Sequence, residues 1–366
     1  MQFRGALEKM EPYSPGKKRP GAIKLSSNEN PFGPSPKAIE AVRRVAPELH
    51  IYPDGGATEL REAVARKHGL ATDQIVVGNG SDEVLTLAAA SLIEPGDEGI
   101  TAEHTFSQYA FATRLYGGVI RTTPMQAGTF DLDALLAPIG PRTRILFVCN
   151  PNNPTGTYRS HEELARFMER VPEDILVILD EAYADYALAK DFPRSEELLE
   201  QYENLLVLRT FSKIYGLAGL RVGYGMGSPE LISMLNRARQ PFNSNSAAQA
   251  AALAALTDEA HRIKSVELNQ QAYDQMSRAL EERGIFHYPS QANFICVDLE
   301  RDTKPVYEEL ANGGITVRTL HSFGLPTMLR ITLGPLDVME RLVGLLDEAL
   351  AAAPRTDTGP FTSRRP

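Results

Sequence analysis

The chain has 366 residues and 43% hydrophobic content, which suffices for a large core and exceeds a single small domain. Its formal net charge of −9 argues against a general nucleic-acid binder, and no apolar run approaches the roughly 18–20 residues that span a membrane. The two cysteines, Cys149 and Cys296, form no CxxC pair, and the N-terminus lacks a secretory apolar segment, so a cytoplasmic protein without disulfides is expected.

Residues 1–35 are rich in Pro, Gly, Ser and Asn and predict an N-terminal arm. After a short helix over 37–45, an apolar strand ends in QIVVGNG (74–80), and SDEVLTLAAASLI (81–93) has helical spacing. Ser81 is the expected N-cap of that helix, with Asp82 and Glu83 in its first turn.

Near-continuous apolar runs cover 144–150, 174–183 and 204–213, and a weaker strand covers 220–226. Strands buried on both faces of a parallel sheet have this pattern. The alternation of such strands with helices predicts an α/β fold in three layers, with helices on both faces of a mostly parallel central sheet.

The pattern changes after about residue 243. A strong helix former covers 246–256, a long polar helix covers 258–283 with Gly284 at its stop, and a closing helix covers 341–353. Short strands are expected at 292–299 and 328–334. We therefore predict a large domain over 36–250, a smaller α+β domain over 251–353 and a disordered tail over 354–366.

Polar residues follow the predicted strands, and ligands bind at the carboxyl ends of strands in open parallel sheets. NGSDE (79–83) is a turn at a helix start whose free amides suit a phosphate, although an ordinary capped turn looks the same. It is neither a Walker loop nor a dinucleotide fingerprint. In CNPNNPTG (149–156), two X-Pro bonds and a glycine hold Asn153 on a rigid frame, or mark a plain surface loop.

Two further strand ends carry charged residues. Asp180 directly follows the five apolar residues ILVIL, where a carboxylate is unfavourable unless a cation or a proton meets it or it caps a helix. In TFSKIYGLAGLRVGY (210–224), Lys213 follows an apolar run and can lose its proton to attack a carbonyl, although most lysines face solvent. Arg221 offers a bidentate grip for a phosphate or carboxylate, or a surface ion pair.

Together these residues match the needs of pyridoxal 5'-phosphate. Its aldehyde needs a lysine, its ring nitrogen a carboxylate, its ring hydroxyl a hydrogen-bond donor, and its phosphate amides, hydroxyls and a guanidinium. No metal is expected, because HEELA (161–165) lacks the second histidine of HExxH and the seven histidines are scattered.

With these residues the chain resembles the fold-type I, class II pyridoxal-phosphate aminotransferases, and among them most resembles the histidinol-phosphate aminotransferases. The similarity covers nearly the whole chain. It rests on LSSNENPFGPSP (25–36), YPDGGATELREAVA (52–65), GNGSDE, NPNNPTG, DEAYADY, TFSKIYGLAGLRVGY, RQPFNSNSAAQAAALAAL (239–256) and FGLPTMLRITLG (323–334).

The resemblance implies that Lys213 forms a Schiff base with the cofactor and shuttles a proton between Cα and the C4′ carbon. It implies that Asp180 pairs with the pyridine nitrogen, and that Asn153 and Tyr183 contact the ring hydroxyl. The residues implied around the phosphate are Gly80, Ser81, Thr210, Ser212 and Arg221, with Asp82 adjacent.

The resemblance also assigns the outer parts of the site. Phe106 matches the ring that stacks on the cofactor, where many relatives have Tyr. Tyr52 matches a tyrosine that reaches the cofactor of the neighbouring subunit, which implies a homodimer with active sites at the interface. The residues implied for substrate binding are Arg330, Arg318, Asn153 and the arm residue Tyr13; the stretch Thr319-Leu320-His321 departs from the family pattern.

The implied reaction is transamination between L-glutamate/2-oxoglutarate and imidazole-acetol phosphate/L-histidinol phosphate, in histidine biosynthesis. An aromatic-amino-acid aminotransferase on the same scaffold is the nearest alternative. A pyridoxal-phosphate-dependent decarboxylase or carbon–sulfur lyase is a further one. A non-catalytic effector domain is the alternative from another class, but no DNA-binding segment is attached.

Overall fold

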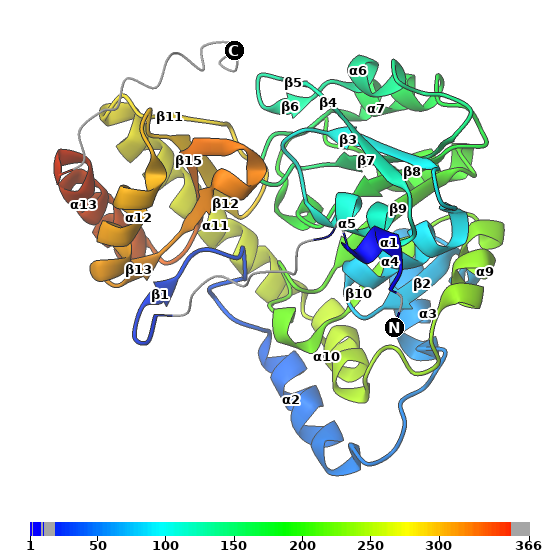
Figure 1. The fold of residues 1–366 in the computed structure, drawn as a ribbon. Helices are drawn as coiled ribbons and strands as arrows, with labels where there is room; N and C mark the ends of the chain where they lie inside the picture. The colour runs from blue at the N-terminus through cyan, green and yellow to red at the C-terminus, as the bar shows by residue number, and fades with distance from the viewer. Residues whose placement is uncertain (2, 9, 11–18, 353–366) are drawn as a thin grey trace.

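A computed structural model describes residues 1, 3–8, 10 and 19–352. Its secondary structure forms two bodies, one around a seven-stranded sheet and one around a four-stranded sheet (Figure 1). Tyr13 and the tail over 354–366 lie outside the described residues, so their predicted roles stay predictions.

The seven-stranded sheet is the centre of the larger body. Its strand order is β2-β10-β9-β8-β7-β3-β4, and only β10 runs antiparallel to its neighbours. The strands in that order are β2 (Ile75–Gly78), β10 (Gly223–Met226), β9 (Leu205–Thr210), β8 (Leu176–Asp180), β7 (Thr143–Cys149), β3 (Glu98–Ala102) and β4 (Val119–Thr123).

Strands β2, β3, β8 and β10 are buried at every position, which shows that both faces of this sheet are covered. The predicted α/β fold with a mostly parallel sheet is therefore confirmed. The helices of this body are α2 (Pro36–Val45), α3 (Thr58–His68), α4 (Ser81–Leu92), α5 (Gln108–Leu115), α6 (Leu132–Leu136), α7 (His161–Met168), α8 (Ser195–Gln201), α9 (Pro229–Ala238) and α10 (Ser246–Leu256). A short helix α1 (Gly5–Glu8) precedes them, and β5 (Met125–Gln126) pairs with β6 (Thr129–Phe130).

The smaller body is an antiparallel sheet in the order β11-β12-β15-β14, packed on three helices. Its strands are β11 (Phe286–His287), β12 (Phe294–Asp298), β14 (Arg318–Leu320) and β15 (Leu325–Thr332). Its helices are α11 (Glu259–Glu282), α12 (Thr303–Asn312) and α13 (Leu336–Ala352).

Part of the predicted arm belongs to this smaller body. Strand β1 (Ile23–Lys24) pairs in parallel with β13 (Ile315–Thr316), and Leu25 is buried in the same hydrophobic cluster as α11 and α13. The domain limits at residues 36, 251 and 353 stay a prediction, and the arm packs on the core of the smaller body through Ile23 and Leu25.

The predicted strands and helices are found where the apolar runs lie, with ends moved by a few residues. One predicted cap is wrong. Gly80, with φ of 82°, is the N-cap of α4, and Ser81 is its first helical residue. A positive φ favours glycine, so Gly80 takes the non-helical cap position and the helical backbone begins at Ser81. None of the helices in the described part of the chain combines the length and apolar composition that a membrane span needs.

The core of the larger body generates a stability prediction. Leu206 in β9 is 0% exposed, whereas Leu188 is 55% exposed. We expect Leu206→Ala to lower the free energy of unfolding by about 2–5 kcal/mol, because it leaves a cavity between sheet and helices. Leu188→Ala should stay within about 0.5 kcal/mol of the parent chain. Urea unfolding followed by circular dichroism measures both; equal shifts would contradict the assigned core.

Candidate active site

One edge of the seven-stranded sheet collects the predicted polar residues. Strands β7, β8 and β9 are parallel, so the residues after them emerge at the same edge. Strand β10 runs the other way, and its first residue Gly223 pairs with Gly78 and Thr210, the last residues of β2 and β9. Arg221, which precedes β10, is therefore delivered to the edge that also holds Asp180 and Lys213.

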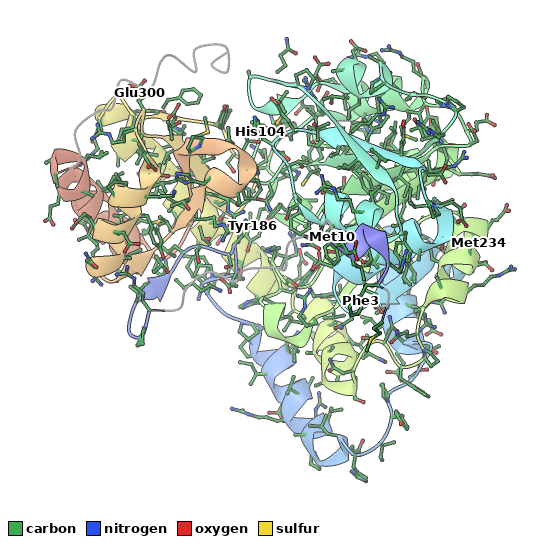
Figure 2. All side chains as sticks on the ribbon, in the orientation of Figure 1. Phe3, Met10, His104, Tyr186, Met234 and Glu300 are labelled. Atoms are coloured by element: carbon green, nitrogen blue, oxygen red, sulfur yellow. The ribbon has the colours of Figure 1, made fainter. Side chains whose placement is uncertain are left out.

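These residues surround a pocket of about 640 Å³. The predicted site residues that line it are Ser81, Asp82, Phe106, Asn153, Asp180, Tyr183, Thr210, Ser212, Lys213, Arg221, Arg318 and Arg330. The edge of the larger sheet and strands β14 and β15 of the smaller body thus contribute to one site. His104, labelled in Figure 2, also joins the two bodies: its Nδ1 lies 2.6 Å from the carbonyl oxygen of Phe323.

Asp180 is a buried carboxylate held in one orientation. Its Oδ2 accepts a hydrogen bond of 2.7 Å from the Tyr109 hydroxyl, and its Oδ1 accepts one of 3.1 Å from the Ala182 amide. Burial raises the pKa of Asp180 to about 6, while these two hydrogen bonds oppose the shift. A cationic N–H from a ligand would restore the ordinary ionised state, so this carboxylate suits a pyridinium nitrogen.

Lys213 is half-buried at the other side of the pocket. Its Nζ donates to the carbonyl oxygen of Ser27 at 3.3 Å and lies 5.5 Å from the centre of the Tyr183 ring. Burial, together with the charge of Arg330, lowers the pKa of Lys213 to about 8. A substantial fraction of this amine is therefore neutral near physiological pH, as a nucleophile requires.

A cup for an anion lies at the start of α4. Gly80 and Ser81 open the helix, whose N-terminal amides and dipole attract negative charge. Arg221 Nη2 forms a 3.2 Å ion pair with Asp82, and its Nη1 lies 3.4 Å from the Ser212 hydroxyl. The ion pair expected as the alternative role of Arg221 is thus present, and both of its residues line the pocket.

Two arginines face each other across neighbouring strands. Arg318 of β14 and Arg330 of β15 are register partners, an arrangement in which like charges repel. Arg330 is buried, donates to Asn153 Oδ1 and, at 2.9 Å, to the Ser26 carbonyl oxygen, while its Nε has no partner among the described residues. The buried Arg330 guanidinium, with an unused N–H donor and the Arg318 guanidinium nearby, is suited to an anionic ligand.

Tyr183 and Asn153 present donors beside these groups. Asn28 Nδ2 donates to the Tyr183 hydroxyl at 2.9 Å, which leaves the Tyr183 O–H free to donate to a ligand. Burial raises the pKa of Tyr183 above its usual value, so the phenol keeps its proton. Asn153 accepts from Arg330 through Oδ1, which leaves its Nδ2 as a second donor.

Sequence reasoning missed several residues of the site. Asn28 holds Tyr183, and the carbonyl oxygens of Ser26 and Ser27 meet Arg330 and Lys213. These residues lie in the stretch LSSNENPFGPSP, which carried the resemblance but no assigned role. Tyr109 was also missed; it lies in the first turn of α5, and its ring meets Phe106, which precedes the helix.

Two predicted residues of the described chain do not line the pocket: Gly80, which lies beside the Arg221 guanidinium, and Tyr52, which lies away from the site. The Tyr52 side chain is 79% exposed, is absent from the pocket lining and stacks on Phe242 with ring centroids 4.7 Å apart. A role in the neighbouring subunit's site is compatible with this exposure and stays a prediction.

The pocket fits pyridoxal phosphate by its chemistry. A buried carboxylate, a lysine of lowered pKa, two ring-hydroxyl donors and an N-terminal helix cup lie around one cavity. At Gly80 a side chain would strain the backbone, whose φ is 82°, and would displace the Arg221 guanidinium from the cup. Among the described residues, no three His, Cys, Asp or Glu side chains are grouped as a metal ion would require.

Residues 20–346 match the sequence family of class I and II aminotransferases. The chain belongs to this family. A histidinol-phosphate aminotransferase of Moorella thermoacetica is 46% identical over 95% of this chain and 93% of its own length, and one from a Geobacillus species is 46% identical over 96% and 98%. The resemblance inferred from the motifs is thereby confirmed.

A solved structure agrees with this aminotransferase over almost its whole length. The histidinol-phosphate aminotransferase of Sinorhizobium meliloti, crystallised in complex with pyridoxal-5'-phosphate, superposes with a TM-score of 0.90 at 28% identity. The match covers 96% of this chain and 98% of that one.

The lowered pKa of Lys213 generates a pH prediction. Burial and the positive charge of Arg330 favour the neutral amine, so acylation of Lys213 should rise with pH and reach half its maximal rate near pH 8, following its pKa of about 8. Competitive labelling with acetic anhydride, read by peptide mass spectrometry, measures this midpoint in the protein without added cofactor.

Arg330→Met is the matched variant, because it removes the charge but keeps an unbranched side chain. Its midpoint should move to higher pH. A parent midpoint near the ordinary lysine value of about 10.4 would contradict the described environment.

Proposed function

We propose that this aminotransferase uses pyridoxal 5'-phosphate to exchange an amino group between L-glutamate/2-oxoglutarate and imidazole-acetol phosphate/L-histidinol phosphate, a step of histidine biosynthesis. The observation that carries the proposal is the pairing of Lys213 and Asp180 in one pocket with the opposed arginines Arg318 and Arg330. The names of the relatives at 46% identity support the choice of substrate.

When bound, pyridoxal phosphate supplies an aldehyde that condenses with amines and a ring that accepts the electrons of a broken Cα–H bond. Asp180 holds a proton at the ring nitrogen by its negative charge. The α4 cup, Ser212 and Arg221 bind the phosphate, and the Tyr183 and Asn153 donors orient the ring through its hydroxyl.

Lys213 moves the proton of the reaction. Its Nζ, with a pKa of about 8, can take a proton from a substrate carbon and return it without a large energetic gap in either direction. The hydrogen bond to the Ser27 carbonyl oxygen and the Tyr183 ring limit the directions that this flexible side chain explores.

The opposed arginines serve two substrates in turn. The glutamate carboxylates and the phosphate of histidinol phosphate are both anions that a planar guanidinium binds through two hydrogen bonds. Binding of either anion relieves the repulsion between Arg318 and Arg330, and offers a partner to the unpaired Arg330 Nε.

An aromatic amino acid is the second candidate substrate. Phe106, Phe111 and Phe323 line the same pocket and offer an apolar surface to a ring. The stretch Thr319-Leu320-His321, which departs from the family pattern, follows Arg318 directly and bears on the same choice.

A donor panel tests the substrate. We expect histidinol phosphate to react faster than Phe, Tyr or Asp in single-turnover reactions of the cofactor-loaded protein. Arg318→Met should lower kcat/KM for histidinol phosphate by about 10- to 100-fold, the loss of one or two charge-assisted hydrogen bonds, and change Phe turnover less.

Lys213→Ala is the control for chemistry in that panel. It should interconvert glutamate and 2-oxoglutarate at no measurable rate, and activity at the parent rate would refute the assignment of Lys213. A panel in which Phe reacts faster than histidinol phosphate would favour the aromatic alternative.

We also propose a homodimer in which Tyr52 completes the site of the neighbouring subunit. Leu49, Ile51, Tyr52 and Phe242 are between 45% and 79% exposed, and Tyr52 stacks on Phe242, so this apolar surface would gain from cover by a second chain. A cytoplasmic location is proposed as well, because both cysteines are buried free thiols.

Subunit mixing tests the shared site. Tyr52→Ala and Lys213→Ala should each be impaired alone, whereas an equal mixture should regain roughly a quarter of the parent activity, because about half of its dimers are mixed and one of the two sites in each mixed dimer has both residues intact. Mixing after dissociation in mild denaturant, followed by an activity assay, measures this. Absence of any recovery, with mixed dimers verified by mass spectrometry, would place Tyr52 in its own chain's site or outside both.

A further inference from the structure

Tyr109 lies outside the pocket lining and contacts Asp180, the carboxylate that lines the pocket. It is in the first turn of α5, is 0% exposed, and donates its hydroxyl proton to Asp180 Oδ2 at 2.7 Å. Burial raises the pKa of Tyr109 well above its usual value, so the phenol stays protonated and can act only as the donor in this pair.

The ring of Tyr109 is held as firmly as its hydroxyl. It stacks on Phe147 of β7 with ring centroids 5.1 Å apart and an interplanar angle of 10°. Its edge meets Phe106, at 5.7 Å and 82°, and Phe106 lines the pocket. One side chain therefore links the carboxylate at the end of β8 to the aromatic ring that forms the pocket wall.

The hydrogen bond has a definite electrostatic effect. Burial disfavours the charged form of Asp180, and the Tyr109 and Ala182 hydrogen bonds stabilise that form. Two further charges have smaller effects on Asp180: the negative charge of Asp82 opposes its ionisation, and the positive charge of Lys213 favours it. Cys149, also near, has a pKa raised to about 12 by burial, so it adds no negative charge at neutral pH. Among the interactions that lower the pKa of Asp180, the Tyr109 hydrogen bond is thus the strongest, and it favours the anion before any ligand binds.

We propose that Tyr109 is a positioning residue that decides where the proton between Asp180 and the cofactor ring nitrogen resides. With the phenol in place, Asp180 is the weaker base and the proton stays on the ring nitrogen. Without it, Asp180 becomes the stronger base and takes a larger share of that proton. This inference rests on the proposed use of pyridoxal phosphate.

The proton position matters because a protonated ring accepts electrons better than a neutral one. Tyr109 would therefore control how readily the substrate Cα–H bond is broken, although it touches neither the substrate nor the cofactor. Two bonds fix the carboxylate, one on each oxygen, and each oxygen keeps a second lone pair for the ring N–H.

Tyr109→Phe removes the hydroxyl and keeps the ring on Phe147 and Phe106. Tyr224→Phe is the matched control, because Tyr224 is also buried in the same core and its hydroxyl contacts His68 Nε2 at 3.0 Å, outside the pocket lining. Both variants lose one buried tyrosine hydroxyl, and only one of them loses it from Asp180.

The readout is ¹⁵N NMR of pyridoxal phosphate labelled at the ring nitrogen, with the dissociation constant of the cofactor measured alongside. We expect Tyr109→Phe to move the ¹⁵N resonance toward the value of neutral pyridine and to weaken cofactor binding about tenfold. Tyr224→Phe should leave the resonance and the affinity at the parent values.

An unchanged resonance and affinity in Tyr109→Phe, or an equal change in Tyr224→Phe, would overturn the inference. If Tyr109→Phe does not fold, 3-fluorotyrosine in place of Tyr109 supplies the test, since its stronger donor should slow cofactor dissociation, and an equal or faster rate would count against the idea. A parent protein that binds no pyridoxal phosphate would refute the proposed function itself, which separates the two failures.

Discussion

Asp180 ends a strand in which every residue is buried, and its charge has to be satisfied at that depth. The protein supplies two donors, Tyr109 and the Ala182 amide, but neither is a cation. The site is thus arranged around a carboxylate that is held in place and that forms no ion pair with any of the described residues. This is the physical condition under which a cationic ring nitrogen binds with a net gain, because the unfavourable desolvation of the carboxylate has already occurred on folding.

A second electrostatic constraint comes from the smaller body. Arg318 and Arg330 are opposed in the register of β14 and β15, and the burial of Arg330 lowers its pKa. Folding brings these like charges together, so part of the stability of the small sheet is given up at the site. An anionic substrate recovers it. The two arginines therefore bind the anionic group of the substrate, while Asp180 binds the ring nitrogen of the cofactor.

The segment from Ser26 to Glu29 joins the two bodies at this pocket. Asn28, with φ of 57°, donates to Tyr183 of the larger body, while its backbone amide donates to Thr332 of the smaller one. The carbonyl oxygens of Ser26 and Ser27 reach Arg330 and Lys213. This stretch is anchored by β1 and Leu25 in the core of the smaller body, which explains why the part of the predicted arm nearest the site is ordered by packing.

The amino-acid sequence by itself determined the strands and the polar residues that follow them. It also determined the chemical roles open to Lys213 and Asp180 and, through its motifs, the family. It did so because a buried parallel strand must be apolar along its length, and a charged residue directly after it stands out. Only the tertiary structure decided the residues that act through others. Tyr109 looks like any core aromatic on a helix, and its contact with Asp180 joins positions 71 residues apart. Arg221 reaches the site edge because β10 runs antiparallel, and Gly80 rather than Ser81 caps α4, with a φ of 82° that glycine adopts readily. Pairing across strands and contacts between distant segments depend on how the chain folds back, and a local pattern of residues carries no record of that.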